Sequence, residues 1–147
     1  MKNQLLTYPK QPSICNCMNV RRASRAVTQF YDEQLKPCGI TIAQLSMLLR
    51  LKETDALTIS QLAQNMRIDR TTLNRNMKPL LENDLIILQQ GKDSRTKLVS
   101  LTTQGRQTAE DGWSCWEKAQ ELLLTYLGKE DTAKLTALLN KLEALAP

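Results

Sequence analysis

Residues 58–101 read TISQLAQNMRIDRTTLNRNMKPLLENDLIILQQGKDSRTKLVSL, and two helical patterns in them are followed by a change of period. Apolar side chains recur at helical spacing in a short run after Thr58 and in a longer run after Asp69. Two β-prone runs, 85–88 and 97–101, then flank a polar turn that contains Gly91. This order predicts a short helix, a tight turn, a second helix and a β-hairpin, which is a helix-turn-helix followed by a wing.

The predicted helices begin at residues that can cap them. Thr41 and Thr58 each stand three residues before a glutamine, which is the spacing of a capping box. Asp69 can cap the second helix of the motif. Pro79 lies inside that helix and removes one backbone amide, so we expect a kink or an early tightening there. The stripe that we expect to face inward is Leu73, Met77, Leu80 and Leu81.

The polar side chains of this segment suit DNA. Arginine and asparagine can bond bidentately to guanine and adenine edges, whereas hydroxyls and lysine suit phosphates. The candidates on the outer face of the second helix are Arg70, Thr71, Thr72, Asn74, Arg75 and Lys78. The candidates on the hairpin are Lys92, Asp93, Arg95 and Lys97. Asp93 is near enough in the chain to orient Arg95, whose guanidinium can enter a narrow minor groove.

Two alternatives remain open for this surface. A polar outer helix face is often only solvated, and winged helices also occur in modules that bind protein instead of DNA. We favour DNA because the helix and the wing are independent features that support one cationic surface. A pure protein interface is expected to be less cationic there.

Four pieces of the sequence carry a family resemblance. They are Leu62-Ala63, Asp69-Arg70-Thr71-Thr72-Leu73, Leu80-Leu81-Glu82 with Leu85-Ile86, and Lys92-Asp93-Ser94-Arg95 followed by Val99-Ser100-Leu101-Thr102-Thr103-Gln104-Gly105. Together they resemble the MarR family of winged-helix transcriptional regulators, over nearly the whole chain. The resemblance implies a homodimeric repressor on a pseudo-palindromic operator, released by a small-molecule or oxidant effector. It also implies that Arg95 is the minor-groove arginine and Asp93 its supporting acid.

We therefore expect a mainly α fold with a small β-hairpin wing, as a single MarR-type domain over residues 1–147. Residues 1–12 are expected to form an N-terminal arm, 41–101 the winged-helix DNA-binding lobe, and 13–38 and 103–147 the dimerisation helices. The terminal helices are more apolar than a small central module requires. Their apolar faces pack either within one chain or against a second copy. We favour the homodimer because a monomer would expose a large apolar patch.

Composition excludes several kinds of site. The 147 residues carry a net charge of +5 and include four cysteines but no histidine. Without histidine there is no Ser-His or Cys-His nucleophile pair and no His-ligated metal, and we expect neither an enzyme nor a cofactor. The charge permits nucleic acid or an anionic membrane as partner. No apolar run is long enough to span a membrane and no export signal is evident, so we expect a cytoplasmic protein with reduced thiols and no membrane partner.

The cysteines suggest a possible redox sensor. Cys15 and Cys17 precede an arginine-rich helical turn, where a helix dipole and cations favour thiolate. By resemblance to the organic-hydroperoxide-sensing branch of the family, Cys17 is the reactive cysteine and Tyr31 a supporting tyrosine, although Ile42 stands where that branch has a second tyrosine. Cys115 is a candidate resolving partner. The alternatives are a thiol peroxidase that uses Cys17, and cysteines that are only small apolar residues.

Overall fold

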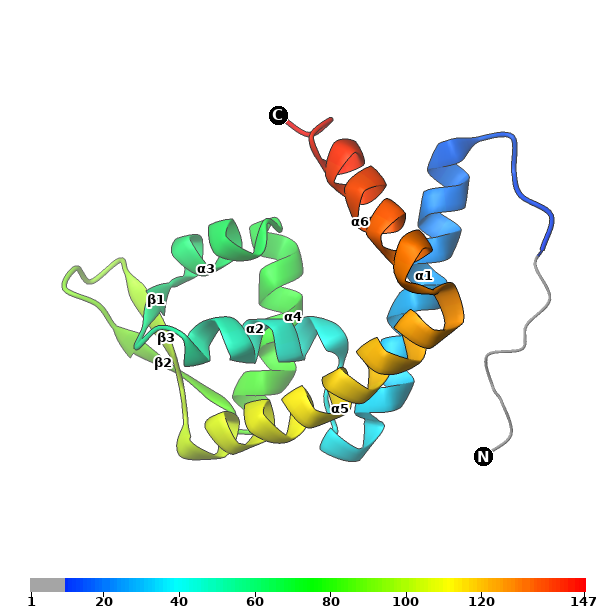
Figure 1. Ribbon diagram of the computed structural model, residues 1–147. Coiled ribbons are helices and arrows are strands. Elements are labelled where there is room, and N and C mark those ends of the chain that lie inside the picture. The colour runs from blue at the N-terminus through cyan, green and yellow to red at the C-terminus, as the bar shows by residue number, and fades with distance from the viewer. Residues whose placement is uncertain (1–9) are drawn as a thin grey trace.

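The computed structural model describes residues 10–147, so most of the predicted N-terminal arm lies outside the described residues. The elements are α1 (Asn16–Leu35), the 3-10 helix η1 (Lys36–Cys38), α2 (Ile42–Lys52), β1 (Leu57–Thr58), α3 (Ile59–Met66), α4 (Arg70–Glu82), β2 (Ile86–Gln90), β3 (Lys97–Leu101), α5 (Thr103–Leu127) and α6 (Lys129–Glu143). Elements α2 to β3 form a winged-helix lobe, from which α5 leads to α6 and α1 at the other end of the molecule (Figure 1). The predicted fold class is confirmed.

The small sheet has one strand more than the sequence predicts. Its order is β1-β3-β2 and both pairings are antiparallel. Val99 of β3 lies opposite Leu88 on one side and Leu57 on the other. The hairpin of β2 and β3 is confirmed, although β2 extends to Gln90 instead of ending at Leu88. The two residues of β1 are too few to give a periodic signal.

The predicted caps are confirmed. Thr41 and Thr58 each form a capping box with the glutamine three residues later. Asp69 caps α4, and its carboxylate accepts the Thr72 amide at 2.8 Å. The tight turn before α4 is made by Arg67, which has φ of 54°. Helix α4 runs through Pro79 to Glu82, so the proline begins its last turn.

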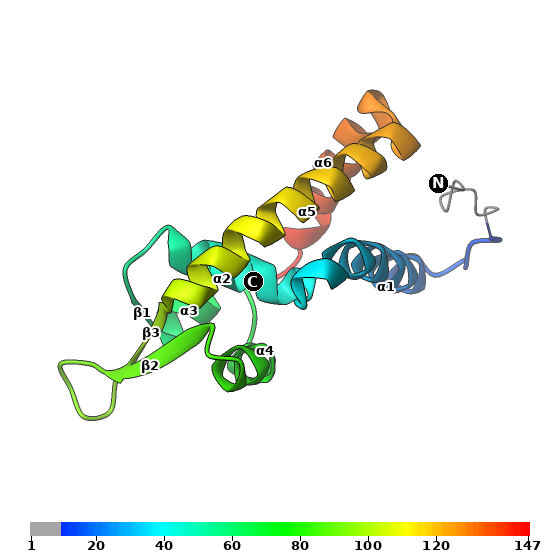
Figure 2. The same ribbon diagram turned by 90° about the horizontal axis from the view of Figure 1, so that it is seen from below.

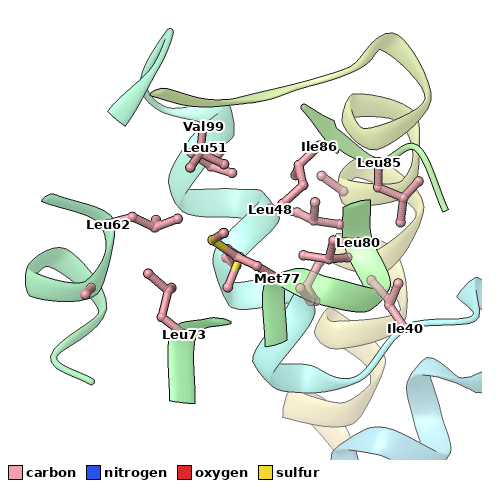
Figure 3. Close-up of a cluster of buried hydrophobic side chains, with 14 of the residues drawn as sticks. Ile40, Leu48, Leu51, Leu62, Leu73, Met77, Leu80, Leu85, Ile86 and Val99 are labelled. Carbon is pink, nitrogen blue, oxygen red and sulfur yellow. The ribbon is translucent and has the colours of Figure 1, made fainter. Parts of the chain in front are cut away.

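Helix α2 lies in the centre of the lobe (Figure 3). Its Leu48 and Leu51 are almost fully buried, and they face side chains from α3, α4, β2 and β3. The predicted inward stripe of α4 is buried at three of its four positions, and Leu81 is half-buried. The facing side chains from these elements are Leu62, Leu73, Met77, Leu80, Ile86 and Val99. This burial fixes which side of α4 remains on the outside.

Two glycines let α5 approach the lobe closely. A Cβ built at Gly105 would overlap the backbone carbonyl of Leu85. The same carbonyl accepts the Thr102 amide at 3.1 Å, while the Thr102 hydroxyl donates to the carbonyl of Asp84 at 2.6 Å. A Cβ at Gly112 would meet a methyl group of Leu45. The first turns of α5 are therefore attached directly to the lobe.

The apolar side chains of the terminal helices remain largely exposed in the single chain. Helix α6 has no buried residue. Its exposed leucines, with Leu145 beyond its end, are Leu135, Leu138, Leu139, Leu142 and Leu145. On α1 the exposed apolar side chains include Met18, Val20 and Val27. Among the described residues, no helix is both long enough and apolar enough to cross a membrane.

We predict that Gly105→Ala lowers the free energy of unfolding by about 3 kcal/mol, near the upper end of the range for overpacking. The new methyl group would meet backbone, which cannot rotate away. Gly112→Ala is the matched control. It is expected to cost less than about 1 kcal/mol, because a leucine side chain can adjust and alanine favours the helix. Urea unfolding followed by circular dichroism measures both, and equal losses would contradict the close approach at Gly105.

Candidate nucleic-acid interface

Helix α4 presents a polar face on the side opposite its buried stripe. Five of the six predicted residues of this helix are exposed: Arg70, Thr71, Asn74, Arg75 and Lys78. Thr72 is half-buried, and its hydroxyl donates to Asp69 at 2.9 Å. This bond and the Thr72 amide hold the pKa of Asp69 below its usual value. Thr72 therefore serves the helix cap and has its hydroxyl proton already engaged.

The four predicted wing residues, Lys92, Asp93, Arg95 and Lys97, are also exposed. The carboxylate of Asp93 accepts the backbone amide of Arg95 at 3.2 Å, so it orders the tip of the turn. Within residues 10–147, the ion pairs do not include one between Asp93 and the Arg95 guanidinium. Asp93 thus positions the arginine through its backbone, and the guanidinium extends from a turn closed between Gly91 and Thr96.

The helix and the wing lie on one side of the lobe. Helix α4 packs against β2, and Figure 2 shows α4 and the hairpin at the edge of the molecule that faces away from the far end of α5. The exposed arginines, lysines and asparagine of both elements therefore share one accessible surface. We call this surface, made of the exposed predicted residues of α4 and the wing, the cationic face.

The turn of the helix-turn-helix is linked to the C-terminal helix. The guanidinium of Arg67 lies 2.6 Å from the Glu143 carboxylate of α6. The hydrogen bond and the charge of Glu143 raise the pKa of Arg67. Both side chains are exposed, so the pair contributes little stability, but it marks a contact between the lobe and α6. No sequence signal indicated it, because the two residues are 76 positions apart.

A cavity of about 250 Å³ lies where η1, α2, α4 and α5 meet. We call this meeting point the joint, because it connects the terminal helices to the lobe. The cavity has polar groups from three of these helices together with apolar side chains. Its lining residues are Cys38, Gly39, Ile40, Gln44, Pro79, Leu80, Asn83, Leu85, Gln104 and Thr108.

The structure brings together a cysteine pair that the sequence did not indicate. The sulfurs of Cys38 and Cys115 are 3.3 Å apart, and both residues are half-buried. Burial, the Cys115 thiol and the charge of Asp111 raise the pKa of Cys38 to about 11. Cys15 and Cys17 are exposed, with Cys15 at the N-cap of α1. In the part of the chain that the structure describes, no three metal-binding side chains are grouped together.

Tyr31 joins α1 to α5. Its ring is buried, its hydroxyl donates to the side-chain oxygen of Gln120, and burial raises its pKa. One helical position later, the Asp32 carboxylate accepts the backbone amide of Ile42 at 2.7 Å, which ties α1 to the start of α2. In this single chain Tyr31 has a structural role, and its predicted support of Cys17 stays a prediction.

Comparison with known proteins identifies the family. Residues 40–97 match the MarR family. The chain is 30% identical over 112 residues to YwoH of Bacillus subtilis, an uncharacterised HTH-type transcriptional regulator, covering 76% of this chain and 82% of that protein. It is 32% identical over 113 residues to the organic hydroperoxide resistance transcriptional regulator of the same species, covering 76% and 72%.

A solved structure agrees over more of the chain. The M. tuberculosis transcriptional regulator MosR, crystallised in complex with DNA, superposes with a TM-score of 0.76 at 30% identity. The match covers 90% of this chain and 99% of MosR. These relatives are transcriptional regulators and not enzymes. The chain belongs to the MarR family of winged-helix transcriptional regulators.

Proposed function

We propose that this MarR-family regulator is a repressor that binds a pseudo-palindromic operator as a homodimer and is released by an effector. The observation that carries the proposal is the cationic face, where α4 and the wing present their arginines and lysines on one side of the lobe. MosR, a relative with the same fold, was crystallised in complex with DNA, which supports DNA as the partner of this face.

In this proposal α4 lies in the major groove and the wing tip reaches the adjacent minor groove. Asn74 and Arg75 are exposed and lie about one turn after the start of α4, where their side chains can reach base edges. Lys78, Lys92 and Lys97 provide charge for phosphates, which sets affinity and register. Arg95 extends from an ordered turn, so a narrow minor groove with enhanced negative potential is its natural site.

The terminal helices are proposed to form the dimer. Five leucines on and after α6, together with Met18, Val20 and Val27 of α1, are each at least 38% exposed in the single chain. Apolar side chains concentrated on two helices that both pack against α5 are expected to be covered. A two-fold axis there would set two copies of α4 about 34 Å apart, one turn of DNA.

The effector is proposed to bind at the joint. A volume of about 250 Å³ suits a small ligand. Hydrogen-bonding groups come from Gln44 of α2, from Gln104 and Thr108 of α5, and from Asn83 at the C-cap of α4. The ligand must bind one relative position of lobe and terminal helices better than the other, because only differential affinity shifts an equilibrium.

A second candidate function is thiol-based oxidant sensing by Cys17. This thiol is exposed in the first turn of α1, and a relative is the organic hydroperoxide resistance regulator of Bacillus subtilis. The roles proposed for Cys15 as a neighbouring thiol, Tyr31 as a support and Cys115 as a resolving partner belong to this candidate. A stoichiometric reaction would distinguish it from a thiol peroxidase, which turns over.

We predict that Lys78→Ala and Arg75→Ala weaken binding to an operator selected from random duplex DNA in different ways. Lys78→Ala removes a phosphate contact in both subunits. It should weaken binding to all DNA sequences equally and reduce the slope of log affinity against log salt concentration by about 1.8. Arg75→Ala removes a base contact. It should cost about 1–3 kcal/mol of binding free energy and relax specificity at one position of each half-site.

Lys118→Ala is the matched control, because it removes the same charge from an exposed position on α5. Fluorescence anisotropy over a range of salt concentrations measures all three variants. Equal effects of Lys118→Ala and Lys78→Ala would refute a localised DNA-binding face. Salt-insensitive binding, or none, would instead favour a protein-interaction module.

We also predict that Leu138→Glu converts the dimer to a monomer, because it would bury a charge in the proposed interface. Leu138 is 57% exposed in the single chain, so the substitution should leave the fold intact. Ala137→Glu is the control, since its side chain is directed about 100° away around α6. Light scattering should give twice 16.7 kDa for the parent and the control, and 16.7 kDa for Leu138→Glu. A monomeric parent would contradict the dimer.

For the sensing candidate, the test uses a background in which Cys38 is serine, so that Cys115 remains available to Cys17 but cannot pair with Cys38. We predict that peroxide abolishes operator binding in this background and that adding Cys17→Ser restores it. Equal sensitivity with and without Cys17→Ser would dismiss Cys17 as the sensor. Peroxide consumption beyond one equivalent per thiol would instead indicate a peroxidase.

A further inference from the structure

Cys38 and Cys115 form a second thiol site, separate from the N-terminal cysteines. Their sulfurs are in contact at 3.3 Å, although the residues are 77 positions apart in the chain. One belongs to η1 and the other to α5, and both pack against the hydrophobic core. The contact is therefore made by the tertiary fold at the joint and not by a local turn.

The geometry allows the two thiols to become a disulfide. A sulfur–sulfur bond is about 2.05 Å long, so the sulfurs have to approach by about 1.3 Å. Gly39 follows Cys38 directly with a φ of 69°, and nothing lies within 4 Å of the place of its missing Cβ, so the chain has space to adjust. Cys38 also lines the cavity of about 250 Å³ at the joint, which a small oxidant can enter.

We propose that Cys38 and Cys115 are a redox pair, which a hydroperoxide converts to an intrachain disulfide that fixes the joint. One thiolate attacks the peroxide oxygen and becomes a sulfenic acid, while the peroxide leaves as an alcohol or water. The second thiol then displaces the sulfenic oxygen, which leaves as water with the proton of that thiol. Two thiols and one hydroperoxide thus give one disulfide, one water and one alcohol, or a second water from hydrogen peroxide.

The contact between the sulfurs lets either thiol resolve a sulfenic acid formed on the other. Cys38 lines the cavity at the joint, through which the oxidant reaches the pair. The second thiol lies within contact distance of the sulfenic acid that results, which favours disulfide formation over further oxidation.

The disulfide would join the corner between α1 and α2 to the middle of α5. It would add a covalent link to a region that already holds the lobe to the terminal helices through Gly112 and the hydrogen bond from the Ile42 amide to the Asp32 carboxylate. A cross-link that closes so long a loop also constrains the unfolded chain. Resting on the proposed function, we expect the oxidised joint to shift the spacing of the two lobes and to change operator affinity about tenfold.

The first experiment maps the bond without reference to DNA. The full chain with Cys15→Ser and Cys17→Ser is treated with hydrogen peroxide, its remaining thiols are blocked, and it is analysed by intact mass and peptide mapping. We expect the loss of two hydrogen atoms, a Cys38–Cys115 cross-linked peptide, monomer mobility on a non-reducing denaturing gel, and full reversal by dithiothreitol. Adding Cys38→Ser or Cys115→Ser should abolish the cross-link.

Several outcomes would overturn the proposal. A cross-link between subunits, stable sulfinic acids at either position, or two blocked thiols after peroxide treatment would each do so. Thermal unfolding gives a second readout, since the oxidised background should melt at a higher temperature than the reduced one, and the serine variants should not respond.

Operator affinity is then measured on the mapped oxidised and reduced forms. A cross-link with unchanged operator affinity would refute the claim that the disulfide at the joint controls DNA binding, while leaving the proposed DNA binding itself intact. Failure of the reduced protein to bind any DNA would instead count against the proposed function.

Discussion

The contact between α5 and the winged-helix lobe is the constraint on which the rest of the molecule depends. At Gly105 the helix meets the backbone of Leu85 with no room for a side chain, and at Gly112 it meets Leu45 in α2. Between these points and α6 the helix is continuous, so its far end cannot move without its near end. The position of α4 and the wing is thereby coupled to α6, and the effector proposed for the joint would act through this coupling.

The cationic face follows from a second constraint, which is the burial of one stripe of α4. Because Leu73, Met77 and Leu80 are almost fully buried, the remaining positions of the helix must carry its polar residues to the outside. The wing acquires its orientation from pairing with β3, whose Val99 has no exposed surface. Core packing thus decides the direction of the arginines, and their own electrostatic interactions contribute little to it.

Prediction from the sequence succeeded where the signal is local. The caps at Thr41, Thr58 and Asp69, the inward stripe and the hairpin depend on residues a few positions apart, and all are observed. The strand β1 was missed because two residues have no period. Asp93 was expected to orient Arg95, and in the described chain its carboxylate accepts the Arg95 backbone amide. The role of the two residues in DNA binding stays a prediction.

The sequence by itself indicated the family, the order of the α-helices and the hairpin, and the candidate residues of the cationic face, because helical period, capping and turn chemistry act over a few residues. Only the tertiary structure decided which distant groups meet. The sulfur contact of Cys38 with Cys115, the pair of Arg67 with Glu143 and the cavity at the joint all join segments that are distant in the chain. Such contacts arise from the packing of whole helices, and no local pattern of residue types specifies them.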